Sequence, residues 1–450
     1  MSLFSKNKKI AIVGYGREGK SLANFLLEYG QNDITILDKN SNLLVTPPLK
    51  FELGDNYLKN LNNFDLIYVS PGVPYFGKEW DKVRNRISSS TNLFFNLCPA
   101  KIIGITGTKG KGTTCHLLEK ILNFSWAGDI FLGGNIGLPL ISFLNKLSKK
   151  DLVIAELSSF QLQNLKQSPG VAVITNLLID HLNYHRTIEE YHQSKLNILR
   201  YQTKKDLAII NLSLIKQTEK VGQGKKYYFS ITKNSNSMAY YDRGWLMIKN
   251  KQNEEKVIKE SEIKIIGKHN RENILAAALT SYLMGAPKKI INQQVKKFRL
   301  SKHHLELILE KNGIKVIDDS AATNPSAMIA AIKSFFAPII LIAGGQDKGF
   351  DYSQLKKDLK REKERIKLII LLGENKNNFY SAVSKDIETI KTASLEEAVK
   401  IAWIEAEKNN IILFSPGAAS LDMFKSAQER GEIFKKINKK MLPDRDSNPN

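Results

Sequence analysis

A glycine-rich segment near residue 107 combines residue types that bind phosphate. It runs from Gly104 to Thr114 as Gly-Ile-Thr-Gly-Thr-Lys-Gly-Lys-Gly-Thr-Thr, between the β-rich residues 101–103 and a helical pattern over 116–122. A glycine-rich turn between a strand and a helix directs backbone N–H groups at one point, where the helix N-terminus and Lys111 add positive charge. The context favours a nucleotide-phosphate site over an ordinary glycine-rich turn, with Thr113 or Thr114 as a hydroxyl ligand of Mg²⁺.

Two further polar side chains follow apolar runs of the same region. Glu156 comes directly after the run 151–155, and His181 follows the run 171–175. Because the carboxyl ends of parallel strands meet at one edge of a sheet, both side chains can converge on the phosphate loop and hold a metal that bridges ATP and substrate oxygens. A single glutamate at a strand end is more often a cap or an ion-pair partner, but the pair in phase with the loop favours metal binding.

The first hundred residues contain a second glycine-rich motif. Gly14-x-Gly16-x-x-Gly19 lies between a strand pattern over 9–13 and a helical pattern over 21–29, and a second strand over 34–37 ends in Asp38. This arrangement is typical of the βαβ unit of a dinucleotide-type fold. A third strand pattern, over 64–69, ends in Ser70-Pro-Gly-Val-Pro74, where ligands bind in such sheets.

Apolar runs alternate with helical patterns along the rest of the chain, which is typical of parallel α/β sheets. We expect further strands over residues 207–210, 315–318, 339–343, 368–372 and 411–414, helices over 273–283, 395–408 and 423–437, and a small antiparallel β excursion within 225–265 that turns at Asp242-Arg-Gly244. The pattern predicts an α/β protein with three domains in series. These are a Rossmann-like domain over 1–98, a central P-loop ATPase-like parallel sheet over 99–299 and a Rossmann-like domain over 300–450.

The composition excludes several classes of protein. The 450 residues include 67 Lys and Arg against 45 Asp and Glu, a net charge of +22. Because the lysines are scattered, we expect no nucleic-acid binding, whereas an anionic small-molecule substrate suits the charge. The sequence has no apolar run of about 18 residues and no signal-peptide pattern, and its two cysteines cannot form a disulfide framework. It therefore predicts a cytoplasmic protein without a membrane span.

Several motifs resemble those of a known enzyme family. Thr106-Gly-Thr-Lys-Gly-Lys111 resembles the ATP loop of Mur ligases and folylpolyglutamate synthetases, which make amide bonds through an acyl phosphate; Lys109 replaces the usual asparagine, and Gly112 is more like the folate branch. Seven other blocks resemble the D-glutamate-adding branch of the Mur ligase family: 14–21, 70–74, 133–137, 156–162, 176–185, 344–350 and 420–424. Because the blocks run in family order over about residues 10–434, the chain is identified as a member of the Mur ligase family.

The resemblance implies roles on the ATP side. The ATP-binding residues would be Gly107, Thr108, Lys109, Gly110, Lys111, Gly112, Thr113, Thr114, Asn270, Asn273, His304 and Asp319. Lys111, Glu156, His181 and Lys195 would be catalytic, and Thr113, Glu156, His181 and Lys195 would bind Mg²⁺. In this family the residue matching Lys195 is a carbamylated lysine, whose anion can bind a second Mg²⁺. From the residues alone, Lys195 would be interpreted as a solvated helix lysine.

The same resemblance implies two substrate sites. The uracil and diphosphate would lie against Gly14, Tyr15, Gly16, Arg17, Asp38, Ser70, Pro71 and Gly72, while Asn135 and His181 would lie at the muramoyl and acyl-phosphate end. D-glutamate would bind Thr323, Lys348, Ser420 and Leu421, because a dicarboxylic amino acid needs a cation and hydroxyl donors.

Three residues depart from the family pattern. Ala321 replaces a lysine, His304 replaces an arginine near the ATP phosphates, and Ala427 replaces an aromatic residue that often lines the D-glutamate site. Each change removes or weakens a substrate contact. Taken alone, the paired histidines His303-His304 would be surface or packing residues.

The resemblance implies an ATP-dependent ligase that adds D-glutamate to UDP-N-acetylmuramoyl-L-alanine in peptidoglycan precursor synthesis, and a monomer. Three alternatives stay open. Gly112 suggests a folylpolyglutamate synthetase-like ligase, and the motif of residues 14–19 suggests an NAD-dependent oxidoreductase, which leaves the ATP loop unexplained. Ala321 and His304 suggest a non-catalytic nucleotide-binding relative of the ligases.

Overall fold

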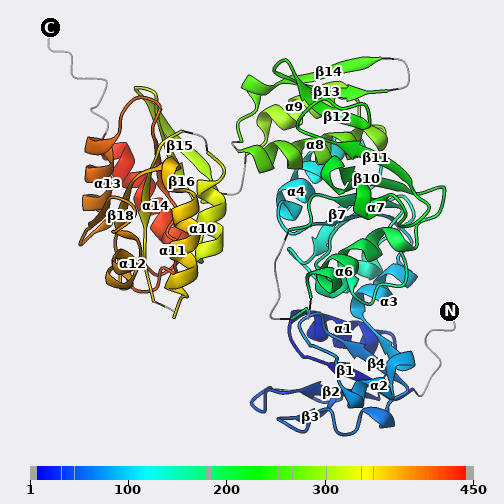
Figure 1. The fold of residues 1–450 in the computed structure, drawn as a ribbon. Helices are drawn as coiled ribbons and strands as arrows, with labels where there is room; N and C mark the ends of the chain where they lie inside the picture. The colour runs from blue at the N-terminus through cyan, green and yellow to red at the C-terminus, as the bar shows by residue number, and fades with distance from the viewer. Residues whose placement is uncertain are drawn as a thin grey trace. The chain divides into compact units, whose positions relative to one another are not determined.

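The described residues form three sheets with α-helices between their strands. The computed structural model describes residues 8–441 apart from residues 32, 45, 179–183, 186, 251–252, 266, 300–301, 336 and 348. The chain divides into two compact units, one of residues 1–262 and 271–296 and the other of residues 263–270 and 297–450. The first unit contains two of the sheets and the second unit contains the third (Figure 1).

The first sheet has five parallel strands in the order β3-β2-β1-β4-β5. The strands are β1 (Ile10–Val13), β2 (Ile34–Asp38), β3 (Lys50–Leu53), β4 (Leu66–Val69) and β5 (Ile87–Ser88), and the helices are α1 (Arg17–Glu28), α2 (Lys78–Asp81) and α3 (Ser90–Leu97). β1 is buried along its whole length, as its apolar sequence predicts. The strand order reverses between β1 and β4, so the loops after these strands flank the crevice where ligands bind in such folds.

The central sheet has nine strands in the order β14-β13-β12-β11-β10-β9-β6-β8-β7. The strands are β6 (Lys101–Thr106), β7 (Ile130–Gly134), β8 (Leu152–Glu156), β9 (Val171–Ile174), β10 (Leu207–Asn211), β11 (Lys225–Phe229), β12 (Ser237–Asp242), β13 (Trp245–Lys249) and β14 (Glu254–Lys259). The pairs from β7 to β12 are parallel, whereas β12, β13 and β14 are antiparallel. The predicted excursion within 225–265 therefore extends the central sheet, which is mixed rather than purely parallel.

The hairpin between β12 and β13 turns where the sequence predicts. Arg243 and Gly244 both have positive φ angles, 47° and 76°, as a two-residue turn of the primed type requires. The helices of this region are α4 (Lys111–Leu122), α5 (Ser159–Leu162), α6 (Ile188–Arg200), α7 (Ile215–Thr218), α8 (Lys268–Leu283) and α9 (Lys288–Lys297). Phe94 of α3 packs edge-on against Phe143, with ring centroids 5.8 Å apart, so an apolar contact joins the first and central sheets.

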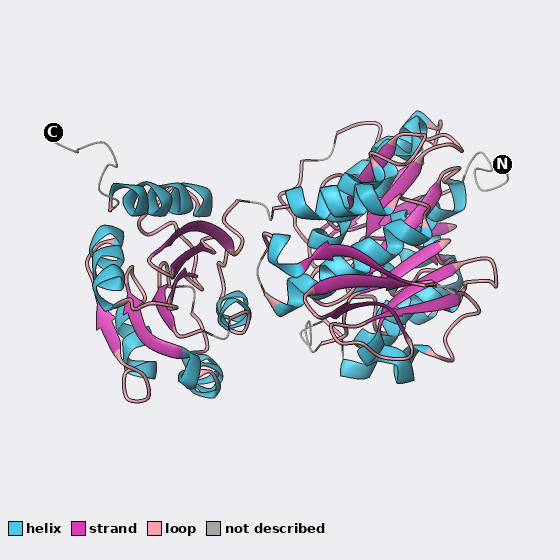
Figure 2. Ribbon diagram, turned by 90° about the horizontal axis from the view of Figure 1, so that it is seen from above, coloured by secondary structure: helices cyan, strands magenta, loops and turns pink. Residues whose placement is uncertain are grey.

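The third sheet has six strands in the order β15-β16-β20-β17-β18-β19, and only the β15–β16 pair is antiparallel. The strands are β15 (Glu306–Lys311), β16 (Ile314–Asp318), β17 (Ile339–Ala343), β18 (Ile366–Leu371), β19 (Thr389–Lys391) and β20 (Ile411–Phe414). The helices are α10 (Pro325–Ile332), α11 (Tyr352–Arg361), α12 (Lys376–Val383), α13 (Leu395–Glu405) and α14 (Ala427–Lys440). Figure 2 shows helices packed around the strands in each unit. The α/β class with three sheets in series is confirmed.

The start of the last helix differs from the prediction. The apolar pattern predicts a helix from Met423, but α14 begins at Ala427, because the side chain of Ser426 accepts a hydrogen bond from the backbone N–H of Glu429 and caps the helix. Among the described residues, no helix is both long and apolar enough to cross a membrane.

Candidate active site

The phosphate loop follows β6, an inner strand of the central sheet. It connects β6 to α4, and β6 pairs with β8 on one side and β9 on the other. Gly107 and Gly110 have φ angles of +153° and +84°, which other residues rarely adopt. A Cβ at Gly107 would overlap Thr175, and one at Gly110 would overlap the side chain of Asn273 from α8. Both glycines are therefore required by the backbone and by close packing.

A residue that the sequence analysis did not select holds the loop in place. The Oδ1 atom of Asn176 accepts hydrogen bonds from the backbone N–H groups of Thr108 at 3.1 Å and Lys109 at 2.9 Å, and its Nδ2 atom donates to the carbonyl of Lys109 at 2.9 Å. The hydroxyl of Thr175 donates to the same carbonyl at 2.7 Å. Asn176 is the second residue after the strand β9, and its position near a strand end was the available signal.

Lys111 and the two threonines after Gly112 take different positions. The ammonium group of Lys111 donates to the carbonyl of Gly107 at 3.0 Å and to that of Thr108 at 3.3 Å, so it lies against the loop. Thr114 is fully buried, and its hydroxyl donates to the carbonyl of Gly110 at 2.9 Å. Thr113 is half-buried, and within the described part of the chain its hydroxyl makes no hydrogen bond. Of the two candidates, Thr113 is thus the one with a hydroxyl available to a metal.

Glu156, at the end of β8, lies beside the start of α4. Its side chain is 3% exposed, and its Oε1 atom accepts a hydrogen bond from Nδ2 of Asn135 at 2.7 Å. Its Oε2 atom is buried and has no hydrogen-bond partner among the described residues. A Cβ at Gly112 would be 3.3 Å from this oxygen, which places it near the first turn of α4. A buried carboxylate oxygen without a partner is costly, and a cation would satisfy it.

Lys195 is buried rather than solvated. It lies on α6, it is 2% exposed, and its ammonium group donates to the carbonyl of Gly107 at 2.9 Å. The same group lies 4.7 Å from the centre of the Tyr191 ring. The interpretation from the residues alone, a solvated helix lysine, is wrong. Lys111 and Lys195 reach the same loop carbonyl from two helices, so Lys195 belongs to the phosphate-loop region.

The remaining predicted residues of this region are partly observed. His181 lies outside the described residues. Its neighbour in sequence His185 is fully buried, and its Nε2 atom lies 3.0 Å from the hydroxyl of Ser159. Asn270 and Asn273 are both buried on α8, and Asn273 packs against the phosphate loop at Gly110.

In the first sheet, the predicted residues at the ends of β1, β2 and β4 contact one another. The carboxylate of Asp38 accepts from the backbone N–H of Tyr15 at 2.7 Å, and the hydroxyl of Ser70 donates to the carbonyl of Gly14 at 2.7 Å. Gly14 has a φ angle of +89°. The predicted residues of these loops lie at the point where the strand order reverses, and they comprise Gly14, Tyr15, Gly16, Ser70, Pro71 and Gly72.

Arg17 makes contacts that its sequence motif does not reveal. At the start of α1, its guanidinium donates to the carbonyls of Gly137 at 3.0 Å, Asn135 at 3.2 Å and Gly134 at 3.4 Å. The neighbouring Glu18 accepts from the Nε2 atom of Gln161 at 2.8 Å. The first turn of α1 thus contacts residues 134–137, at and after the end of β7, and Gln161, which lies on α5 after Glu156.

In the second unit, Asp319 directly follows β16, and its side chain is buried. Its carboxylate accepts from the hydroxyl of Ser415 at 2.7 Å and from the backbone N–H of Leu305 at 3.2 Å. Burial raises the pKa of Asp319 to about 7, although these hydrogen bonds oppose the rise. His304 is exposed overall. Partial desolvation of its ring and the neighbouring His303 lower the pKa of His304.

The predicted D-glutamate residues follow three strands that are neighbours in the third sheet. Thr323 follows β16, Ser420 and Leu421 follow β20, and Lys348, which lies outside the described residues, follows β17. Ser420 is buried, whereas Thr323 and Leu421 are exposed. Ala427 is the first residue of α14. Parallel strand ends therefore bring the described residues of this group, Thr323, Ser420 and Leu421, to one edge of the sheet.

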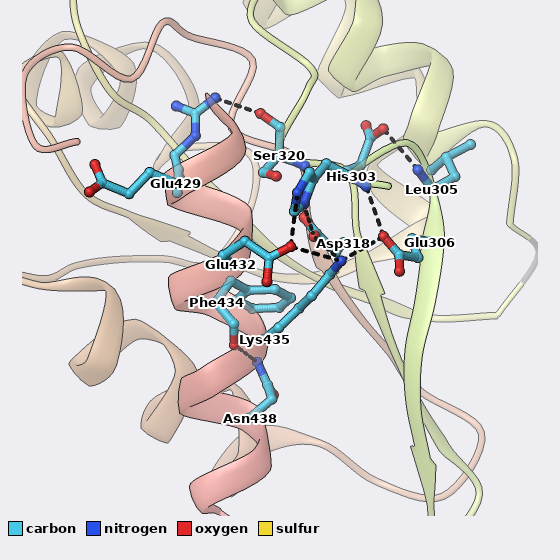
Figure 3. Close-up of polar contacts among 12 residues, drawn as sticks. His303, Leu305, Glu306, Asp318, Ser320, Glu429, Glu432, Phe434, Lys435 and Asn438 are labelled. Carbon is cyan, nitrogen blue, oxygen red and sulfur yellow. Dashed lines mark hydrogen bonds and ion pairs between the residues drawn. The ribbon is translucent and has the colours of Figure 1, made fainter. Parts of the chain in front are cut away.

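His303 is a packing residue, as the sequence analysis expects of a histidine pair, whose members are usually surface or packing residues. It is 5% exposed, and its Nδ1 atom lies 2.7 Å from the carboxylate of Asp318 (Figure 3). Glu306 accepts from the backbone N–H of His303 at 2.8 Å and from the ammonium group of Lys435 at 2.8 Å. The three side chains His303, Glu306 and Asp318 are close enough to share a metal, but Lys435 already supplies the cation.

Comparison with protein families defines the class. The model for the Mur ligase middle domain matches residues 105–281, and the model for the Mur ligase glutamate ligase domain matches residues 303–417. Together the matches cover more than half of the chain, and they include the phosphate loop, Glu156 and Asp319. The chain belongs to the Mur ligase family.

Curated relatives give the branch of this family. A UDP-N-acetylmuramoylalanine–D-glutamate ligase of Ruminiclostridium cellulolyticum is 35% identical, over 96% of this chain and 96% of its own. One of Acetivibrio thermocellus with the same name is 36% identical over the same shares. The chain lies with the UDP-N-acetylmuramoylalanine–D-glutamate ligases.

A solved structure supports the fold. The MurF ligase of Thermotoga maritima in complex with ADP has a TM-score of 0.58 and 16% identity, over 97% of this chain and 96% of its own. At this identity the likeness concerns the fold alone.

Proposed function

We propose that the protein is an ATP-dependent ligase that joins D-glutamate to UDP-N-acetylmuramoyl-L-alanine through an acyl phosphate, a step of peptidoglycan precursor synthesis. The observation that carries the proposal is the convergence at the ends of β6, β8 and β9. These neighbouring strands bring Lys111, Glu156 and the Asn176-supported loop to one edge of the sheet. This is the arrangement that phosphoryl transfer from a nucleotide needs.

The residues fit Mg²⁺. Oε2 of Glu156 is a buried oxygen without a hydrogen-bond partner among the described residues. Thr113, which follows Gly112 in the first turn of α4, has a hydroxyl that is available to a metal. Both are hard oxygen ligands of the kind that Mg²⁺ prefers. Lys195 as an ammonium group offers no ligand atom, so it can serve a metal only in its carbamylated form. Bound Mg²⁺ would neutralise charge on the ATP phosphates.

The chemistry of the chain's own residues follows from these positions. Lys111, on the first turn of α4, can exchange its two loop carbonyls for the oxygens of the transferred phosphoryl group, whose negative charge it stabilises. The substrate carboxylate attacks the γ-phosphorus of ATP and ADP leaves, which gives the acyl phosphate. The D-glutamate amine then attacks the acyl carbon, loses a proton, and the tetrahedral intermediate expels phosphate to give the amide.

The second unit would bring the amino acid. Thr323, Ser420 and Leu421 follow adjacent strands, and Lys348 belongs to the loop after the next strand. A cation and hydroxyl groups suit the side-chain carboxylate of D-glutamate. The amine of the bound D-glutamate must reach the acyl carbon of the acyl phosphate for the amide to form.

A phosphate-release assay tests the proposal. With ATP, Mg²⁺ and UDP-N-acetylmuramoyl-L-alanine, we expect release that depends on D-glutamate and is much weaker with L-glutamate, glycine or L-alanine. Release with folate and L-glutamate would favour the folylpolyglutamate synthetase alternative. Nucleotide binding without release from any combination would favour the non-catalytic relative, and equal turnover with neutral amino acids would contradict the assignment.

A further inference from the structure

Helix α14 places a buried arginine under two of the loops that would bind the amino acid. Arg430 is 2% exposed although it lies near the start of a helix with many charged, solvent-facing residues. Its Nη2 atom donates to the carbonyl of Ser320 at 2.8 Å, and its Nη1 atom donates to the carbonyl of Ala418 at 3.0 Å. One planar guanidinium therefore joins two backbone segments that are far apart in sequence.

These two segments carry predicted substrate residues. Ser320 precedes Thr323 in the loop after β16, and Ala418 precedes Ser420 and Leu421 in the loop after β20. The carbonyls that accept from Arg430 are thus two or three residues away from the side chains expected to touch the amino acid. A shift of either carbonyl would move those side chains.

The third loop packs on the same guanidinium. A Cβ at Gly345, in the loop after β17, would be 3.4 Å from Nη1 of Arg430. This loop is also tied to the loop after β20, because the backbone N–H of Gln346 donates to the carbonyl of Ala419 at 2.9 Å and that of Gly344 donates to the carbonyl of Pro416 at 2.9 Å. All three loops that carry predicted contacts therefore meet at Arg430.

Arg430 remains charged in its buried surroundings, and several polar atoms around it have no hydrogen-bond partner among the described residues. Burial lowers the pKa of Arg430 to about 10, while Asp422 and Asp318 oppose the change, so the group stays a cation at neutral pH. Four buried polar atoms of Arg430 and these loops have no hydrogen-bond partner among the described residues: Nε of Arg430, Oγ of Ser320, Oε1 of Gln346 and Oδ1 of Asp422. Such atoms are rare in packed interiors and indicate a region that takes up polar partners.

We propose that Arg430 is the positioning residue of the amino-acid site: its guanidinium fixes the loops after β16, β17 and β20 in the register that binds D-glutamate. The inference rests on the proposed function. Arg430 acts through the loops and not by touching the substrate, so its loss should weaken amino-acid binding selectively. Formation of the acyl phosphate, which the proposed function assigns to the first unit's phosphate loop, should depend on it much less.

The test compares Arg430→Lys, which keeps the charge but loses the fork, with Arg430→Met, which loses both. Arg365→Lys is the matched control, because Arg365 also donates from Nη1 to a backbone carbonyl, that of Phe335 at 2.6 Å, but at another place in the same unit. Each full-length variant is assayed for the KM of D-glutamate and of ATP. Acyl phosphate is measured separately as the hydroxamate formed with hydroxylamine, ATP and UDP-N-acetylmuramoyl-L-alanine in the absence of D-glutamate.

We expect Arg430→Lys to raise the KM of D-glutamate about tenfold or more, with the KM of ATP and the hydroxamate rate within about twofold of the wild type, as loss of one or two charge-assisted hydrogen bonds produces. Arg365→Lys should change none of these. An unchanged KM for D-glutamate, an equal loss of every activity, or failure of Arg430→Lys to fold would overturn the inference, even if Arg430→Met proves too unstable to assay. If the wild type forms no hydroxamate, the proposed function fails and the inference fails with it.

Discussion

Asn135 and Glu156 are joined by two hydrogen bonds that together orient one carboxylate. The side-chain Nδ2 of Asn135 donates to Oε1 of Glu156 at 2.7 Å, and the backbone N–H of Asn135 donates to the backbone carbonyl of Glu156 at 2.9 Å. With Oε1 engaged in this way, Oε2 is the oxygen left near the first turn of α4. The pair therefore links a predicted substrate residue to a predicted metal ligand.

Replacement of this carboxylate tests its role as a metal ligand. Glu156→Gln keeps the acceptor for Asn135 but removes the negative charge, so we expect roughly a hundredfold lower turnover and a higher Mg²⁺ concentration for half-maximal rate. The measurement is phosphate release across a Mg²⁺ titration. Glu119→Gln, at a partly exposed position of α4, is the control. An unchanged Mg²⁺ dependence in Glu156→Gln would exclude the ligand role.

The cation of the phosphate loop is tested by Lys111→Ala. Its ammonium group contacts the loop carbonyls of Gly107 and Thr108, where the transferred phosphoryl group would lie. We expect a loss of about a hundredfold or more in ATP-dependent turnover, by the size of comparable electrostatic contacts. Lys120→Ala, near the end of the same helix, should retain wild-type turnover. Wild-type turnover in Lys111→Ala would show that this loop does not act in catalysis.

The buried position of Lys195 gives a chemical test of carbamylation. If its amine has taken up CO₂, the functional group is an anion, and Lys195→Ala should lose activity while nucleotide still binds at Lys111. A small carboxylic acid such as acetate should then restore part of the rate, because its oxygens can replace those of the carbamate. The readout is phosphate release with added acetate or methylamine. Rescue by the amine alone, or full activity without rescue, would refute the carbamate.

The pKa of Asp319, raised by burial from 3.8 to about 7, predicts a pH-dependent stability. Between these two values the folded state holds a proton that the unfolded state releases, so unfolding free energy falls as pH rises through this window. Asp319→Asn mimics the protonated acid and removes the effect. We expect the melting temperature of Asp319→Asn to exceed that of the wild type by roughly 5 °C or more at pH 8 and to match it near pH 4. An equal difference at both pH values would contradict the shift.

The sequence predicted the inner strands of the sheets, because most of them are continuous apolar runs. It did not predict the edge strands β3, β5, β7, β15 and β19, which are short or carry polar residues. The phosphate loop after β6 and Glu156 at the end of β8 were selected from the residues themselves, since glycine-rich turns and polar residues at strand ends mark the edge where ligands bind. The residues after β16 and β20 were selected only through the family resemblance. The boundaries of three domains stay a prediction, because the chain divides into two compact units rather than at those positions.

Three features were beyond the sequence for physical reasons. Asn176 supports the phosphate loop through a side chain that looks like any polar residue after a strand, and only the fold brings it to Thr108. The burial of Lys195 depends on how α6 packs, whereas a lysine on a helix is usually solvated. The start of α14 was misplaced because apolar periodicity outweighed a capping signal, Ser426 followed three residues later by Glu429.

The transfer of oxygen from the substrate carboxylate tests the central claim most directly. UDP-N-acetylmuramoyl-L-alanine with ¹⁸O in its alanine carboxylate is incubated with ATP, Mg²⁺ and D-glutamate, and the phosphate released is examined by mass spectrometry. An acyl phosphate keeps one carboxylate oxygen bound to phosphorus when the amine displaces it, so we expect one ¹⁸O in the phosphate for each amide formed. Phosphate without ¹⁸O, or phosphate released at the same rate without D-glutamate, would contradict the account.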